Sequence, residues 1–320
     1  MLYPLTSAGP QTGAVAVSYE LWRDGFKIGD ATSPATVNVD LRLPGGPDPD
    51  PELPGHGNLK LATIVGDDSG QTDDLTPEDV GAGAQVTIPW FAVGGSELLQ
   101  EDDKLQLIWG AQPPHALAPV SAAEAAAKVD ITRPVLPTVL ASEPSGTVQM
   151  AYTVTRVFGA NGEENTALSP SKPVAVLRGQ DLPGEGTALK ELEFTDLNRF
   201  GAIDIEKAQR PLPVRIELYD NVVPGDEIVI HLRAVDSQRP SGGNPIRAAE
   251  EDLPFIRIEQ HHIDEGELTY EIARRWAFIV CTGSATVEYT ATNKFGPVKA
   301  GHKRVVVTVK NPREETCPLP

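Results

Sequence analysis

The most acidic stretch of the sequence is GDDSGQTDDLTPEDVGAG at 66–83, and its residue types are those of a calcium site. Carboxylate oxygens on a flexible, glycine-rich loop are the ligands that calcium takes in proteins. The six candidate ligands are Asp67, Asp68, Asp73, Asp74, Glu78 and Asp79. Their order does not fit an EF-hand loop, because no D-x-D-x-D-G series leads to a glutamate at the twelfth position. A solvated acidic loop is the alternative, and no cofactor other than calcium is expected.

Two of the four tryptophans lie beside charged residues, where an exposed ring could form a platform for a glycan. Trp22 lies near a turn in YELWRDG, and Trp276 follows two arginines in IARRWAF. Core packing is the alternative for both residues. Trp90 and Trp109 fall on inward-pointing positions of alternating segments, so we expect these two in a core.

The sequence carries no recognisable catalytic motif. It contains no G-x-S-x-G elbow, no H-E-x-x-H pair and no phosphate-cradling glycine loop. Serine, histidine and aspartate are all present, as expected at this length, and no pair of carboxylates is singled out for glycoside hydrolysis. We therefore expect a protein that is not an enzyme.

The two cysteines, Cys281 and Cys317, form neither a disulfide framework nor a metal-ligand spacing. Cys281 lies in the apolar run AFIVCTGSATVEY, and Cys317 lies in the proline-containing tail NPREETCPLP. One interpretation is a disulfide that clips the tail onto the last domain. The other is that Cys281 is an ordinary core residue.

Charge and hydropathy narrow the class of partner. The net charge of −18 repels phosphate backbones, so we expect no nucleic-acid partner. No window approaches the roughly 18 consecutive apolar residues of a membrane span. The start, MLYPLTSAGP, lacks the basic and apolar regions of a signal peptide. A length of 320 residues with 29 prolines indicates two or more turn-rich domains.

A hairpin-like pattern occurs three times along the chain. The copies are GAVAVSYELWRDGFKIGDATSPATVNVDL, GTVQMAYTVTRVFGANGEENTALSPSKPVAVL and ATVEYTATNKFGPVKAGHKRVVVTV. Each has an alternating strand with a central tyrosine (Tyr19, Tyr152 and Tyr289), then a glycine-containing turn and a valine-rich strand. The first two copies share a Ser-Pro pair, Ser33-Pro34 and Ser169-Pro170, which the third lacks.

The segments upstream of the last two hairpins also match. AQVTIPWFAVGGSELLQEDDKLQLIWG corresponds to LPVRIELYDNVVPGDEIVIHLRA, so that the acidic turn before Leu105 aligns with Gly225-Asp226 before Ile228. Alternation with period two and turns at roughly 8–12-residue intervals predict all-β sandwich domains.

Proline- and glycine-rich segments set the domain boundaries. We expect a partial unit at 1–42, an extended linker at 43–57, a domain at 58–178, a linker at 179–188, a domain at 189–310 and a tail at 311–320.

The segment 1–41 holds the closing strands of a unit whose opening strands the sequence does not contain. Its strand-pairing residues are Val15, Val17, Tyr19, Val37 and Val39. An unpaired hairpin is marginal in water, and its exposed edges invite pairing with another chain. Truncation of a longer chain is favoured, and completion by a neighbouring subunit is the alternative.

These motifs resemble the Ig-like or fibronectin-III-like tandem repeats of large bacterial surface proteins. The strands Asp103–Trp109 and Gly225–Leu232, the three tyrosines and the two Ser-Pro pairs carry the resemblance. It implies tandem Ig-like sandwiches in a structural or adhesive module at the cell surface or outside the cell, with neighbouring repeats or subunits as protein partners. The alternatives are an oligomer or filament subunit that assembles by strand complementation through residues 1–41, and a glycan-binding accessory domain of a secreted enzyme.

Overall fold

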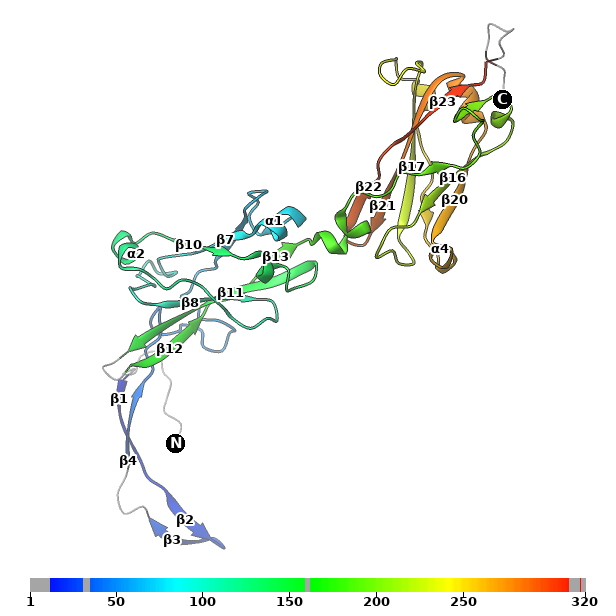
Figure 1. Cartoon of the computed structure of the whole chain (residues 1–320). Helices are drawn as coiled ribbons and strands as arrows, with labels where there is room; N and C mark the ends of the chain where they lie inside the picture. The colour runs from blue at the N-terminus through cyan, green and yellow to red at the C-terminus, as the bar shows by residue number, and fades with distance from the viewer. Residues whose placement is uncertain (1–11, 31–34, 159–161, 311–316, 318–320) are drawn as a thin grey trace. The chain divides into compact units, whose positions relative to one another are not determined.

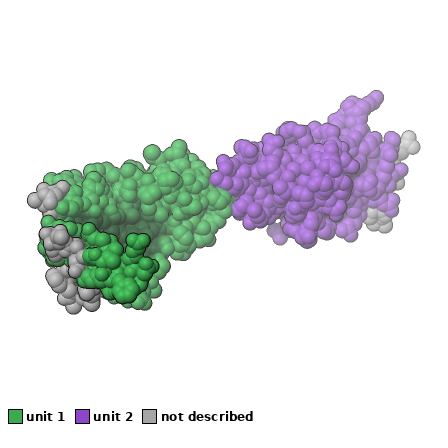
Figure 2. All heavy atoms as spheres, turned by 90° about the horizontal axis from the view of Figure 1, so that it is seen from below, with its two compact units in different colours: residues 1–177 green, residues 178–320 purple. Residues whose placement is uncertain are grey.

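The computed structural model describes residues 12–30, 35–158, 162–310 and 317. The chain divides into two compact units, residues 1–177 and 178–320 (Figure 2). Strands dominate both units, which confirms the predicted all-β fold (Figure 1). Within the described ranges, no helix is long and apolar enough to cross a membrane. The Ser33-Pro34 pair, the first 11 residues and all of the tail after residue 310 except Cys317 lie outside the described residues.

Unit 1 is a sandwich of two sheets. The smaller sheet has the strand order β10-β7-β5, and the larger has the order β6-β13-β11-β8-β9 with β12 also paired to β11. The strands are β5 (Thr63–Gly66), β6 (Asp74–Leu75), β7 (Ala84–Ile88), β8 (Lys104–Trp109), β9 (His115–Ala116), β10 (Ile131–Val135), β11 (Gly146–Phe158), β12 (Glu163–Leu168) and β13 (Lys172–Val176). Three short helices join them: α1 (Pro77–Ala82), α2 (Ala122–Ala127) and α3 (Pro137–Leu140).

Unit 2 is a second sandwich with a corresponding arrangement. Its smaller sheet is β14-β16-β20, and its larger sheet is β15-β23-β21-β17-β18 with β19 paired to β17 and β22 to β21. The strands are β14 (Glu193–Phe194), β15 (Ala202–Asp204), β16 (Leu212–Glu217), β17 (Glu227–Val235), β18 (Glu251–Asp252), β19 (Ile256–Arg257), β20 (Glu267–Ile272), β21 (Thr282–Asn293), β22 (Gly296–Lys299) and β23 (Lys303–Thr308). The helical elements are η1 (Gly179–Asp181), η2 (Pro183–Gly186), η3 (Lys207–Gln209), η4 (Arg247–Ala249), α4 (Gln260–Glu265) and α5 (Arg275–Val280).

The pairing register of the larger sheet is the same in both units. Tyr152 of β11 lies opposite Leu107 of β8, and Tyr289 of β21 lies opposite Ile230 of β17. The outer parallel pair also matches, since Leu75 faces Val176 in unit 1 and Ile203 faces Val307 in unit 2. The two tyrosines therefore occupy one position of one sheet design.

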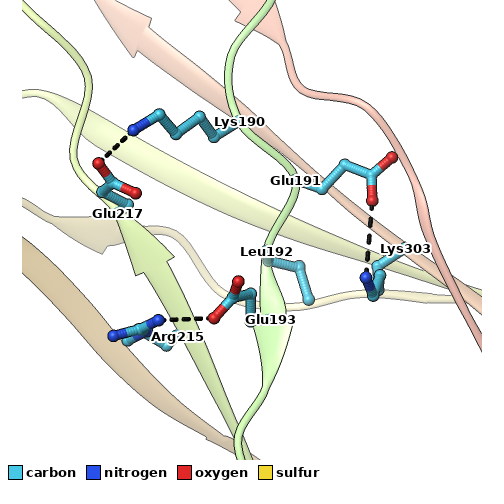
Figure 3. Close-up of a pocket in the computed structure, with 7 residues that line it drawn as sticks. All are labelled: Lys190, Glu191, Leu192, Glu193, Arg215, Glu217 and Lys303. Carbon is cyan, nitrogen blue, oxygen red and sulfur yellow. Dashed lines mark hydrogen bonds and ion pairs between the residues drawn. The ribbon is translucent and has the colours of Figure 1, made fainter. Parts of the chain in front are cut away.

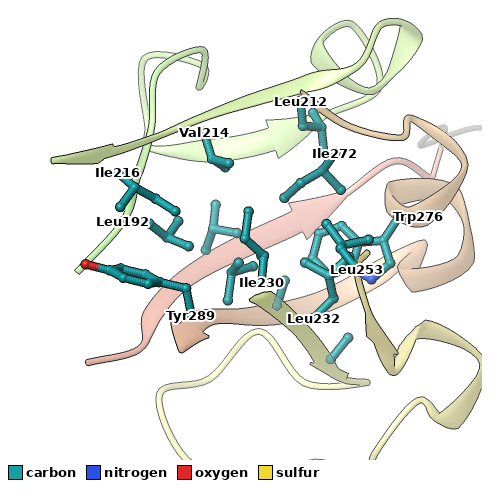
Figure 4. Close-up of a cluster of buried hydrophobic side chains, with 14 of the residues drawn as sticks. Leu192, Leu212, Val214, Ile216, Ile230, Leu232, Leu253, Ile272, Trp276 and Tyr289 are labelled. Atoms are coloured by element: carbon teal, nitrogen blue, oxygen red, sulfur yellow. The ribbon is translucent and has the colours of Figure 1, made fainter. Parts of the chain in front are cut away.

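Alternating apolar residues place the core between the sheets. Every second residue of β8 and of β17 is buried, as the period of two requires. Trp90 and Trp109 are buried in the core of unit 1, as predicted. In unit 2, Tyr289 and Trp276 lie at opposite ends of a cluster that includes Ile230 (Figure 4).

A buried aspartate holds the turn before the strand that faces each tyrosine. In unit 1, Asp103 accepts hydrogen bonds from the Gln100 amide at 2.8 Å and from Arg156 Nε at 2.7 Å. In unit 2, Asp226 occupies the same place and accepts a hydrogen bond from the Tyr219 hydroxyl at 2.8 Å. A buried carboxylate must be paired, so each aspartate fixes the turn to its neighbouring segment.

Residues 43–57 do not form the expected extended spacer, because they pack on unit 1. His56 is buried, and its amide donates to the Leu168 carbonyl at 2.7 Å. The side chain of Asn58 donates to the Gly45 carbonyl at 3.0 Å, which holds the segment in a compact turn. The composition predicted an extended spacer, but the segment is held by hydrogen bonds to Leu168 and Asn58 of the domain.

Residues 179–188 likewise pack on the domain that follows them. They form η1 and η2, and the side chain of Asn221 donates to the carbonyls of Gln180 at 3.0 Å and Leu182 at 2.8 Å. Pro183 and Gly184 are buried. Both proline-rich segments therefore belong to the sandwiches they precede.

A disulfide joins Cys281, directly after α5, to Cys317 in the tail, with the two Cα atoms 5.7 Å apart. Of the two interpretations of Cys281, the structure shows the clip. The bond closes a loop with a sequence separation of 36 residues that contains β21, β22 and β23.

Removing this bond is expected to destabilise unit 2 alone. A loop of this length gives a loss of about 4 kcal/mol in the chain-entropy model, and native disulfides typically contribute about 2–4 kcal/mol. Urea unfolding of the Cys281→Ser/Cys317→Ser variant should show the unit 2 transition at lower urea. Unit 1 has no cysteine and provides the internal control, so a uniform shift of both transitions, or no shift, would contradict the assignment.

Candidate interaction surface

The first described segment forms a long two-stranded hairpin. β1 (Thr12–Val17) pairs with β4 (Ala35–Asp40), and β2 (Glu20–Arg23) pairs with β3 (Phe26–Asp30). Asp24 and Gly25 close it with positive φ angles of 52° and 81°, the backbone twist that suits a two-residue hairpin turn. Among the described residues, no third strand pairs with either edge (Figure 1).

The hairpin repeats the register of the closing strands in both units. One valine or alanine, four residues before the tyrosine, lies opposite a valine of the last strand in each case. The pairs are Val15 with Val37, Val148 with Val174, and Ala285 with Val305. Val15, Val17, Val37 and Val39 thus share one face of the hairpin, the face that points into the core in the two units. Tyr19, the fifth strand-pairing residue, lies just after β1, at the same number of residues from this pair as Tyr152 and Tyr289.

This face, which we call the hairpin face, is open to solvent. The exposed fractions are 52% for Val17, 65% for Tyr19 and 48% for Val37, whereas the side chains at the same positions of unit 1 are 1% exposed or less (Met150, Tyr152 and Val174). Val15 and Val39 are half-buried. Contiguous apolar surface of this kind marks an interaction site.

The tip of the hairpin adds apolar residues that the sequence analysis did not single out. Leu21, Phe26 and Ile28 are all exposed. Alternation alone reads such residues as core, because a pattern of period two does not state whether a second sheet covers it. Their position next to the Asp24-Gly25 turn was the available signal.

Of the two predicted glycan contacts, only Trp22 lies at the surface. Its Nε1 donates to the Glu20 carboxylate at 3.1 Å. For Trp276 the glycan contact is wrong and the alternative of core packing holds, because its side chain is 1% exposed and its Nε1 donates to the buried Ala249 carbonyl at 2.9 Å.

The acidic stretch is spread over β5, β6, α1 and the loops between them. Asp68, Asp74 and Glu78 are exposed, Asp67 accepts from the Gln85 side chain at 3.1 Å, and Asp73 pairs with Lys172 at 2.5 Å. In the described part of the chain, no three His, Cys, Asp or Glu side chains lie close enough together to hold a metal ion. Calcium binding by this stretch stays a prediction.

Asp79 has a structural role in this stretch. It is fully buried against Gly66, where a Cβ would overlap its carboxylate. The carboxylate accepts hydrogen bonds from the amide and hydroxyl of Ser69 at 2.8 and 2.7 Å, and from the amide and hydroxyl of Thr76, the N-cap of α1, at 3.0 and 2.9 Å. Burial opposes the charge, but these bonds outweigh it and hold the pKa of Asp79 well below its usual range.

A hollow on unit 2 is lined almost entirely by charged side chains, and these neutralise one another (Figure 3). Lys190 pairs with Glu217, Arg215 with Glu193 at 2.6 Å, and Lys303 with Glu191 at 3.9 Å. The hydrogen bond from Arg215 lowers the pKa of Glu193. Each charged side chain that lines the hollow therefore lies next to one of opposite sign.

Replacing Asp79 with asparagine is expected to lower the free energy of unfolding of unit 1 by about 2 kcal/mol, since hydrogen bonds to a charged acceptor are lost. Urea unfolding near neutral pH checks this, with the exposed Asp68→Asn as the matched control that should change stability by less than about 0.5 kcal/mol. A depressed pKa means that the contribution of Asp79 is present above the ordinary value of 3.8 and is lost as the pH falls through the lower folded value. The wild-type and Asp79→Asn curves should therefore converge in acid, and a constant gap would contradict the role.

The sequence matches no protein-family model and no curated protein. Among solved structures, the chain is weakly similar to one described as a "Ca2+-stabilized adhesin" that "helps an Antarctic bacterium reach out and bind ice" (13% identity, TM-score 0.31, 94% of this chain and 57% of that one). It is also similar to a "1.5-MDa bacterial ice-binding adhesin" (11%, 0.29, 79% and 65%) and to the chicken interferon gamma receptor alpha chain (7%, 0.26, 79% and 98%). The chain thus spans 57% and 65% of the two adhesin chains, and likenesses this weak carry no argument about function.

Proposed function

We propose that the chain is a structural and adhesive repeat module of an extracellular or surface-exposed bacterial assembly, and that it has no enzymatic activity. The observation that carries the proposal is the shared register: three closing hairpins, two of them within complete sandwiches, follow one design. A fold repeated with its core positions retained and its surface varied is typical of modules that give reach and spacing.

The proline-rich segments support a spacing role. Each is bound to the sandwich that follows it through side-chain amides, as with Asn58 on 43–57 and Asn221 on 179–188. A linker that packs on a domain has fewer accessible conformations than a free linker. Such junctions suit a module that must transmit position along a chain.

The disulfide and the surface charge support the location. Disulfides persist in oxidising environments and are rare in reducing cytosol, so Cys281–Cys317 favours an extracellular setting. A net charge of −18 keeps a protein soluble at high local concentration. The protein partners we propose are neighbouring repeats or subunits.

A spacer is expected to be extended in solution. A compact protein of this length has a radius of gyration of about 20 Å. Small-angle X-ray scattering of the whole chain should give a value well above this. Acidic proteins can also expand because their charges repel one another, and salt screens that repulsion. If the extension comes from the spacing of the domains instead, the radius of gyration should be unchanged between about 0.1 M and about 0.5 M NaCl. A value near that of a compact globule would contradict the spacing role.

A further inference from the structure

We propose that the hairpin formed by residues 12–30 and 35–40 is the closing half of a further sandwich and that its hairpin face and open edge dock the opening half of a neighbouring repeat unit. The occupant has the strand pattern of residues 58–145, the opening half of unit 1. The inference rests on the proposed function as a repeat module and adds the identity of the partner surface.

The hairpin face has the residue pattern of a surface that is covered by a second sheet. Its four valines coincide in register with core positions of both units, and Tyr19 has the sequence position of the buried tyrosines, where the smaller sheet covers them. A two-stranded hairpin is marginal in water without such cover. Burying residues such as Tyr19 against a second sheet would supply the missing stabilisation.

The open edge fits the strand that pairs with β11 in unit 1. That strand is β8, which places Leu107 opposite Tyr152, and β17 places Ile230 opposite Tyr289. By the same register, the docked strand places an apolar residue opposite Tyr19. The backbone groups along β1 and β2 would then complete a ladder as they do in the two units.

Charge at one further position specifies the partner. Arg156 lies four residues after Tyr152 and pairs with the buried Asp103, which precedes Leu107 by four residues. Arg23 lies four residues after Tyr19, is exposed, and has no ion pair within the described ranges. In unit 2 the equivalent residue is Asn293. At this position the hairpin thus resembles unit 1, which has an arginine, rather than unit 2. The docked half should therefore carry an aspartate four residues before the residue that faces Tyr19.

A second copy of this chain does not offer that half. In each described unit the candidate strand already has neighbours on both edges, β11 and β9 for β8, and β21 with β18 and β19 for β17. A second copy would have to open a closed sandwich to donate either strand. The occupant is therefore a further opening half rather than one already in use.

The test uses an extended chain in which a copy of residues 58–145 replaces residues 1–12. The copy is then followed directly by Gly13, just as residues 58–145 are followed by Gly146 in unit 1. Amide hydrogen exchange at 13–40 is measured in this chain and in the original. Docking should slow the exchange by on the order of 100-fold or more. Tyr19→Glu in the extended chain should return exchange to the original rate. Thr36→Glu, on the opposite face, is the matched control and should leave protection in place.

A charge exchange tests the register. Arg23→Asp should reduce the protection in the extended chain, and arginine in place of the aspartate of the added copy that corresponds to Asp103 should restore it. Exchange at 13–40 that stays fast in the extended chain would overturn the proposal. So would protection in the original chain that rises with protein concentration together with dimer formation in sedimentation, because the occupant would then be a second copy. The spacing role is tested separately by the scattering of the original chain at concentrations where sedimentation shows a monomer.

Discussion

The pairing of the tyrosine strand with its neighbour sets the architecture of both units. β11 and β21 are the longest strands, and each holds a neighbour on both edges, so every other strand of the larger sheet takes its position from them. A slip of one residue would turn Tyr152 or Tyr289 from the core to solvent and expose polar neighbours to the core. The buried carboxylates of Asp103 and Asp226 oppose such a slip. Each lies four residues before the residue that faces the tyrosine and is held there by its own hydrogen bonds.

The same backbone pairing is made with a serine in unit 1 and with an alanine in unit 2. In unit 1 the Ser169 hydroxyl accepts from the Tyr152 amide at 2.9 Å, and the Ser169 amide donates to the Tyr152 carbonyl. In unit 2, the Ala300 amide donates a hydrogen bond to the Tyr289 carbonyl at 2.9 Å, and its side chain has no hydroxyl to add a second bond. The backbone hydrogen bond to the tyrosine carbonyl is common to both units and defines the register. The Ser-Pro pair is one sequence that allows the chain to turn between the two closing strands at this position.

The alternation of apolar residues along the sequence predicted the strands and part of the core. Alternation around Tyr19, Tyr152 and Tyr289 identified the paired strands and placed Trp90 and Trp109 in a core, because the side-chain period of a strand is fixed by its geometry. The patterns could not say which apolar faces are covered. The arginines before Trp276 left both a surface platform and core packing open, and the turn of α5 carries the ring inward. The packing of residues 43–57 depends on Leu168, which is distant in sequence, and composition holds no record of it. The partners of Asp79, Ser69 and Thr76, lie close by in sequence, and the capping-box spacing of Thr76 and Asp79 was the available signal.

The disulfide also changes how unit 2 carries load. A force applied beyond Cys317 passes through the covalent bond to Cys281 and enters the fold where β21 begins. The strands β21, β22 and β23 then lie inside a closed loop that bears none of the tension along the chain. Pulling therefore acts on the junction between α5 and the central strand, and it cannot peel away the last strand of the sheet.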